Sequence, residues 1–317
     1  MKTKLFSKLA GCIFAVLIVS FSQLTAYCEN VNNALPGREK TPQCVDPEDA
    51  GKKVINLKVM SINLRHNSDF WEERFPLVAD EIVRLKPDLI GIQEMAIGIN
   101  QTRTLLRLIA ERDPAGELKY HFYEHLKYGP DMIKGEGVTI LSRFPISKKA
   151  AVDLGNSRPA VFARVVPEPG IAIDFYNTHL HHMGGDEVRF PQAQKLVAFM
   201  QDNYAGNFAF LTGDMNAADS SQTIKYFLEE GKMIDTYAAL KGGATKPEDM
   251  TSPIILMKKN VPQAPRNRID YVFALPPAGA DNRLKIIDSI VCLRNARADG
   301  LYPSDHLGVM TTFQLVY

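Results

Sequence analysis

The chain has 317 residues, of which 45% are apolar and 23% are charged, a composition typical of a packed soluble domain that excludes fibrous and disordered proteins. This length allows one large domain or two small ones. The formal net charge is +1, and it becomes −2 for a chain beginning at Glu29, because residues 1–28 contain three lysines and no acid. Binding of nucleic acid through bulk positive charge is therefore disfavoured, while a local basic groove stays open.

Residues 1–28 are predicted to be a signal peptide. Lys2, Lys4 and Lys8 precede the apolar run 13–21, and small or polar residues follow it. The alternative is an uncleaved anchor, but the apolar span is at the short limit for crossing a bilayer. We therefore expect export through the Sec pathway to the periplasm or the cell exterior, without stable membrane insertion after the signal is removed.

Residues 29–53 are predicted to be a polar linker, and residues 54–317 the folded domain. Cys44 and Cys292 remain after signal removal, in a compartment that permits disulfides. Two interpretations stay open: the cysteines pair, or Cys292 is a small buried hydrophobic residue of a strand. We expect a monomer.

The domain alternates short apolar runs with runs of helical period. Strands grouped around helices, without a regular βαβ rhythm, predict an α+β fold. We expect a four-layer α/β/β/α sandwich, in which two mixed sheets pack together and helices lie outside. In chain order the pattern predicts a strand at 54–63, a helix at 70–85, a strand at 88–94, a helix at 103–112, strands at 120–125, 137–142, 160–166 and 171–180, a helix at 186–201, a strand at 208–211, a helix at 220–229, and strands at 269–274, 285–293 and 307–316.

Polar side chains stand where several of these predicted strands end. One such residue would be unremarkable, but six separate buried polar ends would each cost a few kcal/mol unless they were paired. Convergence on one site is the simpler explanation. Carboxylates and amides without a thiolate suit a hard cation such as Mg²⁺, and imidazoles beside it could act as a base or a donor. The residues are Asn63, Glu94, His179, Asp214, Asn216, Asp270, Asp305 and His306.

Seven segments resemble the motifs of one family. The chain is similar, over residues 55–316, to the endonuclease/exonuclease/phosphatase superfamily, which includes pancreatic-type deoxyribonucleases and secreted bacterial members. One motif is a weak signal, whereas seven in family order are specific. The matching segments are Met60–Arg65, Pro87–Glu94, Gly135–Pro145, Asn177–Leu180, Thr212–Asn216, Arg268–Phe273 and Ser304–His306.

The resemblance implies a metal site for Mg²⁺, with Mn²⁺ as a substitute. Glu94 matches the principal ligand, Asn63 lies beside it, and Asp305 matches a ligand of the same or a second ion. Asn63 is also implied to contact the substrate phosphate. Asp270 matches the acid that orients the histidine at His306, a pair that activates water or stabilises the phosphorane.

Further roles follow from the same resemblance. Asp214 and Asn216 match a pair that orients the nucleophile and holds a phosphate oxygen. His179 matches the histidine that donates to the phosphate or protonates the leaving group. Glu136 matches a Glu that pairs with that histidine, and Arg158 a phosphate-contacting arginine. These donors suit a transition state with charge on its non-bridging oxygens.

The resemblance leaves the substrate open. Lys134 stands where pancreatic-type nucleases carry a tyrosine, which weakens the nuclease interpretation. The favoured hypothesis is a secreted phosphodiesterase or phosphatase that uses metal-assisted attack of water on small or lipid-derived phosphates. The alternative is a non-specific secreted endonuclease acting on nucleic acid. A non-catalytic binding protein would require a missing ligand, and none is missing. His181 and His182 are predicted to lie in a surface turn.

Overall fold

The computed structural model describes residues 53–243, 246–254, 265–277 and 283–317. The predicted signal peptide and Cys44 lie outside these residues, as does the predicted linker except for Lys53. No helix among the described residues is long and apolar enough to cross a membrane.

The first sheet contains six of the described strands, in the order β11-β12-β1-β2-β4-β3. Strands β1 and β2 are parallel, and β12 pairs with β1 in antiparallel register from Val54 opposite Val316 to Ser61 opposite Val309. The first and last strands of the domain are thus neighbours. The bounds are β1 Val54–Asn63, β2 Leu89–Ala96, β3 His121–Leu126, β4 Glu136–Ser142, β11 Leu284–Cys292 and β12 Gly308–Val316.

The second sheet has the order β5-β6-β7-β8-β10-β9 and contains the strands that lie between β4 and β11 in the sequence. Its parallel pair is β7 and β8, with His179 opposite Asp214, and β10 places Asp270 on the other side of Asp214. The bounds are β5 Ile146–Asp153, β6 Pro159–Glu168, β7 Ile171–His179, β8 Phe208–Asp214, β9 Ile234–Asp235 and β10 Asp270–Leu275.

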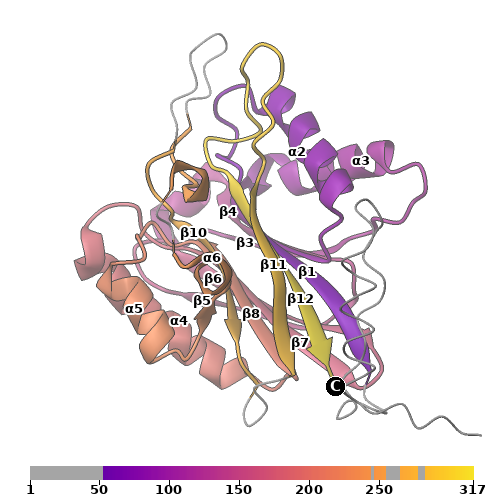
Figure 1. The fold of residues 1–317 in the computed structure, drawn as a ribbon. Coiled ribbons are helices and arrows are strands. Elements are labelled where there is room, and N and C mark those ends of the chain that lie inside the picture. Colours follow the sequence, from indigo (N-terminus) through magenta and orange to yellow (C-terminus); the bar gives the residue numbers. More distant parts are fainter. Residues whose placement is uncertain (1–52, 244–245, 255–264, 278–282) are drawn as a thin grey trace, which may run out of the picture. The chain divides into compact units, whose positions relative to one another are not determined.

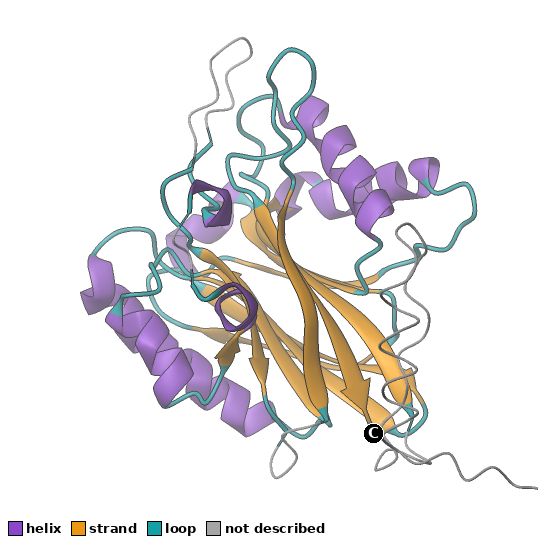
Figure 2. Ribbon diagram, in the orientation of Figure 1, coloured by secondary structure: helices purple, strands orange, loops and turns teal. Residues whose placement is uncertain are grey.

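Helices α2 to α5 cover the outer faces of the two sheets (Figures 1 and 2), whereas Tyr237 of α6 packs in the cluster between the sheets. Helices α2 and α3 share one apolar cluster with the first sheet, and α4 and α5 share another with the second. A third cluster contains residues of both sheets, so it lies between them. The bounds are α2 Trp71–Leu85, α3 Gln101–Arg112, α4 Gly185–Asn203, α5 Gln222–Glu229 and α6 Thr236–Lys241, with 3₁₀ turns η2 Ile97–Ile99, η3 Gly129–Lys134 and η4 Pro247–Asp249.

These layers confirm the predicted fold class. The sequence did not predict β5, the two-residue strand β9 or α6. Strand β5 is an edge strand that carries Lys148 and Lys149 and is only partly buried, so its sequence lacks a clear apolar alternation. Helix α6 has only six residues, too few for a helical period to be visible.

The two sheets approach closely beneath the ends of their parallel strands. A Cβ atom added to Gly91 of β2 would lie 1.9 Å from Thr212 Oγ1 of β8. Beside it, the Asn177 side chain donates to the Ile92 and Thr139 carbonyls at 2.9 and 3.0 Å and accepts from Gln93 Nε2 at 2.7 Å. This buried amide fixes one sheet relative to the other. The neighbouring ends of β2 and β8 are thereby held in a fixed position relative to each other.

Candidate active site

Glu94 stands at an irregularity of β2. The pairing of β2 with β4 shifts register between Ile92 and Met95, and Glu94 has a φ of +52°. The strand does not end at Glu94, as the sequence predicted, but continues to Ala96. A bulge reorients the side chain that it carries. The bulge in β2 therefore sets the direction of the Glu94 carboxylate.

Asn63 joins the carboxylates of the two sheets. Its Nδ2 donates to Glu94 Oε1 at 3.2 Å and to Asp214 Oδ2 at 2.9 Å. Its Oδ1 accepts from the main-chain N–H of Arg65 at 2.9 Å. The side chain is 1% exposed, so its orientation is set by these bonds. Asn63 thus holds Glu94 and Asp214 near each other.

Asp214 is buried at the centre of the site. Its Oδ1 accepts from the Asn216 N–H at 2.9 Å, while Oδ2 lies 3.4 Å from His179 Nε2 and 3.8 Å from His306 Nε2. Burial and the neighbouring charge of Asp270 raise the pKa of Asp214 to about 7. A carboxyl group with a pKa near 7 can accept or release a proton at neutral pH.

Asp270 and His306 form the predicted pair. His306 Nδ1 lies 2.9 Å from Asp270 Oδ2 and 3.2 Å from Oδ1. Burial alone would lower the pKa of His306, but the carboxylates of Asp270 and Asp214 outweigh it and raise that pKa well above its usual value. The imidazole Nε2 lies 3.2 Å from Ser252 Oγ. The pair therefore favours a cationic imidazole beside Asp214.

His179 has a different environment. Its Nε2 lies 3.0 Å from Asn216 Nδ2, and its buried Nδ1 has no hydrogen-bond partner among the described residues. Burial, together with the charges of Arg158 and Lys127, lowers the pKa of His179 well below its usual value. The imidazole is therefore neutral at pH 7.

The pairing of Glu136 with His179 that the resemblance implied does not form. Glu136 begins β4, and its Oε1 lies 2.6 Å from Lys127 Nζ. A lysine beside a carboxylate offers a stronger partner than a neutral imidazole, so the ion pair draws Glu136 toward Lys127. Lys127 had no role in the sequence analysis. Glu136 contributes to the rim of the site through this ion pair.

Arg158 lies beside this rim and is 4% exposed. Its Nη2 lies 3.0 Å from His182 Nδ1, and its Nη1 has no hydrogen-bond partner among the described residues. Burial lowers the pKa of Arg158, although the charges of Glu136 and Asp214 oppose this shift. His181 and His182 lie in the loop before α4, where the sequence placed a surface turn. Arg158 therefore offers an unpaired N–H beside the carboxylates.

Asp305 forms an ion pair with Arg65. Its Oδ2 accepts from Arg65 Nη1 at 2.7 Å. Two sets of acidic and imidazole groups could each share an ion within the described residues, since their ligand atoms lie within 4.8 Å of one another. These sets are Glu94, His179 and Asp214, and Asp214, Asp270 and His306. Of the predicted metal residues, the structure brings Glu94 and Asn63 together, whereas Asp305 is paired with Arg65.

Ser252 is a further site residue that the sequence analysis missed. It belongs to a segment that pairs with Asn267, and Leu307 N donates to the neighbouring Thr251 carbonyl at 2.7 Å. These contacts join residues far apart in the sequence, in a region for which the sequence predicted no helix or strand. No local signal could have indicated that its hydroxyl meets His306.

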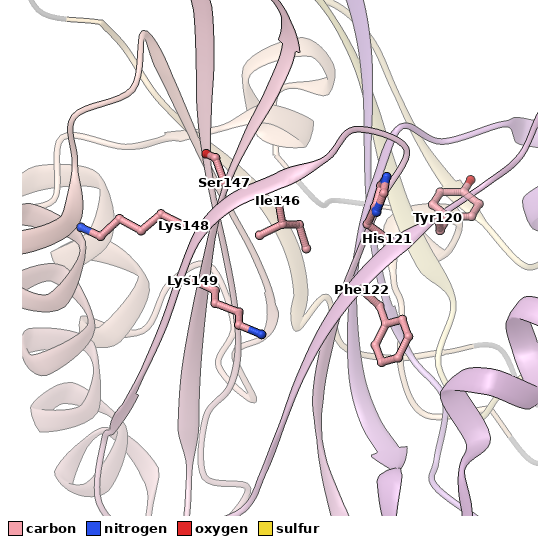
Figure 3. A pocket seen from close by; sticks show the side chains of 7 residues that line it. All are labelled: Tyr120, His121, Phe122, Ile146, Ser147, Lys148 and Lys149. Carbon is pink, nitrogen blue, oxygen red and sulfur yellow. The ribbon is translucent and has the colours of Figure 1, made fainter.

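A pocket of about 500 Å³ lies elsewhere, between the edge strands β3 and β5 (Figure 3). His121 in its lining pairs with Ser142, at the opposite end of β4 from Glu136. None of the candidate active-site residues lines this pocket. Its other lining residues are Tyr120, Phe122, Ile146, Ser147, Lys148 and Lys149. It is therefore separate from the candidate active site.

Comparison with solved structures shows the same fold in several proteins. An endonuclease/exonuclease/phosphatase family protein from Bacteroides thetaiotaomicron is 21% identical, with a TM-score of 0.65, covering 83% of this chain and 96% of that one. A mannosyl-6-phosphatase from the same species is 22% identical, with a TM-score of 0.61 and coverages of 81% and 99%. D. rerio TDP2, complexed with a single-strand DNA product, is 16% identical, with a TM-score of 0.63 and coverages of 81% and 98%.

The sequence comparisons agree with this fold. No curated protein matches the chain. The model of the Endonuclease/Exonuclease/phosphatase family matches residues 60–306, most of the chain, including every predicted site residue. This span and the clustered acids, amides and imidazoles support a phosphoester hydrolase. The chain belongs to the endonuclease/exonuclease/phosphatase family.

Proposed function

We propose that the chain is an exported, divalent-metal-dependent hydrolase of phosphate esters, with phosphodiesterase or phosphatase activity. The observation that carries the proposal is the position of Asp214. This carboxyl group is buried between two histidines of unlike charge and has a pKa raised to about 7. Titratable groups whose environments separate their pKa values are typical of acid and base catalysis.

The donor set fits a hard cation. Glu94 is partly exposed and bonds Asn63, while the ligand atoms of Glu94, His179 and Asp214 lie within 4.8 Å of one another. Carboxylate oxygens are the ligands that Mg²⁺ and Mn²⁺ prefer. When bound, such an ion would neutralise charge on the phosphate and orient the attacking water. Glu94 would hold it, and Asn63 would position this carboxylate beside Asp214.

The other side chains act on the phosphate and the water. Asp214 is placed to accept the proton of an attacking water, because its pKa lies near neutrality. Cationic His306, oriented by Asp270, stabilises negative charge that develops on the phosphate oxygens. The unpaired Nη1 of Arg158 is available to donate to another of these oxygens.

The alternative substrate is nucleic acid. The chain is 16% identical to D. rerio TDP2, whose structure contains a single-strand DNA product. This similarity is a reason to test hydrolysis of nucleic acid. Lys127 and Arg158 place positive charge beside the site, and this charge suits phosphate groups of either substrate class. The assay must therefore include both classes.

The test is an assay of the purified mature domain against bis-p-nitrophenyl phosphate, p-nitrophenyl phosphate, RNA and plasmid DNA. With Mg²⁺ or Mn²⁺ we expect hydrolysis of a chromogenic ester, loss of activity with EDTA and recovery when the ion is restored. The Arg158→Met variant should raise KM about tenfold or more, because it loses a charge-assisted hydrogen bond. Absence of hydrolysis in a folded protein with either ion would contradict the proposal.

Export is the part of the proposal that rests on residues 1–28 alone. Cells expressing the full-length chain should contain a shortened protein in the periplasm or the medium. An unprocessed chain in the soluble cytoplasm would exclude this localisation. The mass of the recovered protein would give the cleavage position.

A further inference from the structure

We infer that Arg74 is a positioning residue that locks together the two loops bordering the metal site. Arg74 lies in the first turns of α2 and is fully buried. It touches none of the candidate catalytic side chains. The inference rests on the proposed function, because it assigns Arg74 a task in the same site.

The contacts of Arg74 use all five N–H groups of the guanidinium. Its Nε donates to the Asp69 carbonyl at 2.7 Å, and Nη2 donates to the carbonyls of Ser68 at 2.8 Å and Arg65 at 3.5 Å. Its Nη1 donates to the carbonyls of Leu64 at 2.9 Å and Pro303 at 3.0 Å. Every acceptor is a main-chain oxygen, and no carboxylate within the described part of the chain bonds this guanidinium.

The first of these loops has an unusual backbone. Between β1 and α2, positive φ values occur at Arg65, His66, Asp69 and Phe70, at +54°, +34°, +48° and +60°. Non-glycine residues adopt this conformation only where the surrounding structure imposes it. Four of the five carbonyls that accept from Arg74 belong to this segment, so the guanidinium supports its backbone from inside.

The same loop borders Glu94 and Asp305. The His66 N–H donates to the Glu94 carbonyl at 2.8 Å, and the Arg65 side chain bonds the Asp305 carboxylate. The second loop carries Pro303 directly before Ser304, Asp305 and His306. A single side chain therefore joins the segment beside Glu94 to the segment that carries Asp305 and His306.

The charge of Arg74 matters for this role. Burial lowers its pKa to about 10, although the charges of Asp305 and Asp69 oppose the shift. The guanidinium therefore remains protonated at neutral pH. A lysine has only three donors and cannot satisfy five carbonyls. The site consequently requires the geometry of arginine rather than positive charge alone.

The experiment compares Arg74→Lys with Arg164→Lys. Arg164 is the control, because it is a partly buried guanidinium away from the site, bonded to Asp174 of β7 and to the Asn203 carbonyl of α4. Both variants should lower the melting temperature. The main readout is calorimetric binding of Mn²⁺. We expect Arg74→Lys to weaken binding about tenfold or more, as for other residues that orient metal ligands, and Arg164→Lys to leave it within about twofold of the wild type.

A second readout needs neither metal nor activity. Hydrogen exchange of the metal-free proteins should show protection lost together in 64–70 and 301–307 for Arg74→Lys, and in neither segment for Arg164→Lys. Faster exchange in 64–70 alone, or unchanged Mn²⁺ affinity in Arg74→Lys, would overturn the inference. A wild type that binds no Mn²⁺ would instead reject the proposed function, while the exchange data would still decide the role of Arg74.

If Arg74→Lys does not fold, the wild type alone provides the test. Adding Mn²⁺ should increase protection in 64–70 and 301–307 in parallel, because both segments are joined through one guanidinium. Protection gained in only one of them would refute the link.

Discussion

The two ends of the pair of packed sheets differ in whether their buried polar atoms have hydrogen-bond partners. At the end away from the site, Asp88 accepts from the Lys58 N–H at 2.8 Å and from Arg143 Nη1 at 2.9 Å, and Phe210 packs on Phe313 with ring centroids 4.6 Å apart. At the site end, Arg158 and other buried side chains retain atoms without a partner among the described residues. A stable fold normally pairs such groups, so their concentration at one end marks the surface prepared for a ligand.

The strongest test of this contrast compares an acid just before the start of β2 with an acid near its site end. Glu94→Gln, at the site end of β2, should reduce turnover by at least about 1,000-fold, because an amide cannot replace a charged ligand. Asp88→Asn, just before β2, should lower stability and leave turnover of the folded protein unchanged. Steady-state kinetics at saturating Mg²⁺ and thermal melts measure both. Retained activity in Glu94→Gln would remove Glu94 from the metal site.

The next test asks whether Asp270 and His306 act as one unit. Each single variant, Asp270→Asn and His306→Ala, should lose about 100-fold or more in kcat, and the double variant should be little worse than His306→Ala alone. The reason is that Asp270 acts through the imidazole that it orients. Fully multiplicative losses in proteins of unchanged stability would contradict the pairing.

A smaller effect is expected of pH on the free energy of unfolding. The pKa of Asp214 is raised in the folded protein, so the folded state binds more protons than the unfolded state, and stability falls as pH rises from about 4 to about 7. In the metal-free protein we expect the contribution of Asp214 to stability to fall by on the order of 1–3 kcal/mol over this range. The lowered pKa of His179 gives a contribution of opposite sign, so the Asp214 contribution is measured as the difference between the wild type and Asp214→Asn. Saturating Mg²⁺ should oppose the loss, because a nearby cation favours the charged carboxylate.

Denaturant unfolding at several pH values measures this dependence. Asp214→Asn serves as the control, since its slope with pH should be flatter whatever its absolute stability. An equally steep slope in that variant would assign the effect to another group.

The smallest effect on kcat is expected from a substitution at the end of the sheets away from the site. Phe210→Leu removes the ring contact with Phe313 and should cost about 1–2 kcal/mol of unfolding free energy, with kcat and KM of the folded fraction unchanged. Unfolding curves and kinetics at low temperature provide the two readouts. A comparable loss in kcat would show that the two ends are coupled.

The sequence predicted those features that depend on local pattern or on motif order. The bounds of β1, Val54–Asn63, agree with the prediction because a buried strand gives a clear apolar run. The contact between Asp270 and His306 agrees because both residues match family motifs. The layered fold follows from the same two sources.

The remaining features depend on contacts across the fold. The left-handed backbone at Glu94 arises from pairing between β2 and β4, and the ion pair of Lys127 with Glu136 depends on how β3 connects to β4. Arg74 looks like an ordinary surface residue of an amphipathic helix until its carbonyl partners are known. Such residues carry no periodic or motif signal.

The pairing of β1 with β12 has a consequence for biogenesis. During synthesis the segment that begins at Val54 emerges first, but its partner extends to Val316 and emerges last. Until then one side of β1 has unpaired main-chain groups, and Asp305 and His306 are missing from the site. The nascent protein therefore cannot complete the candidate site before β12 and the loop that precedes it have been synthesised. A site built in this way forms only after both ends of the domain have been synthesised.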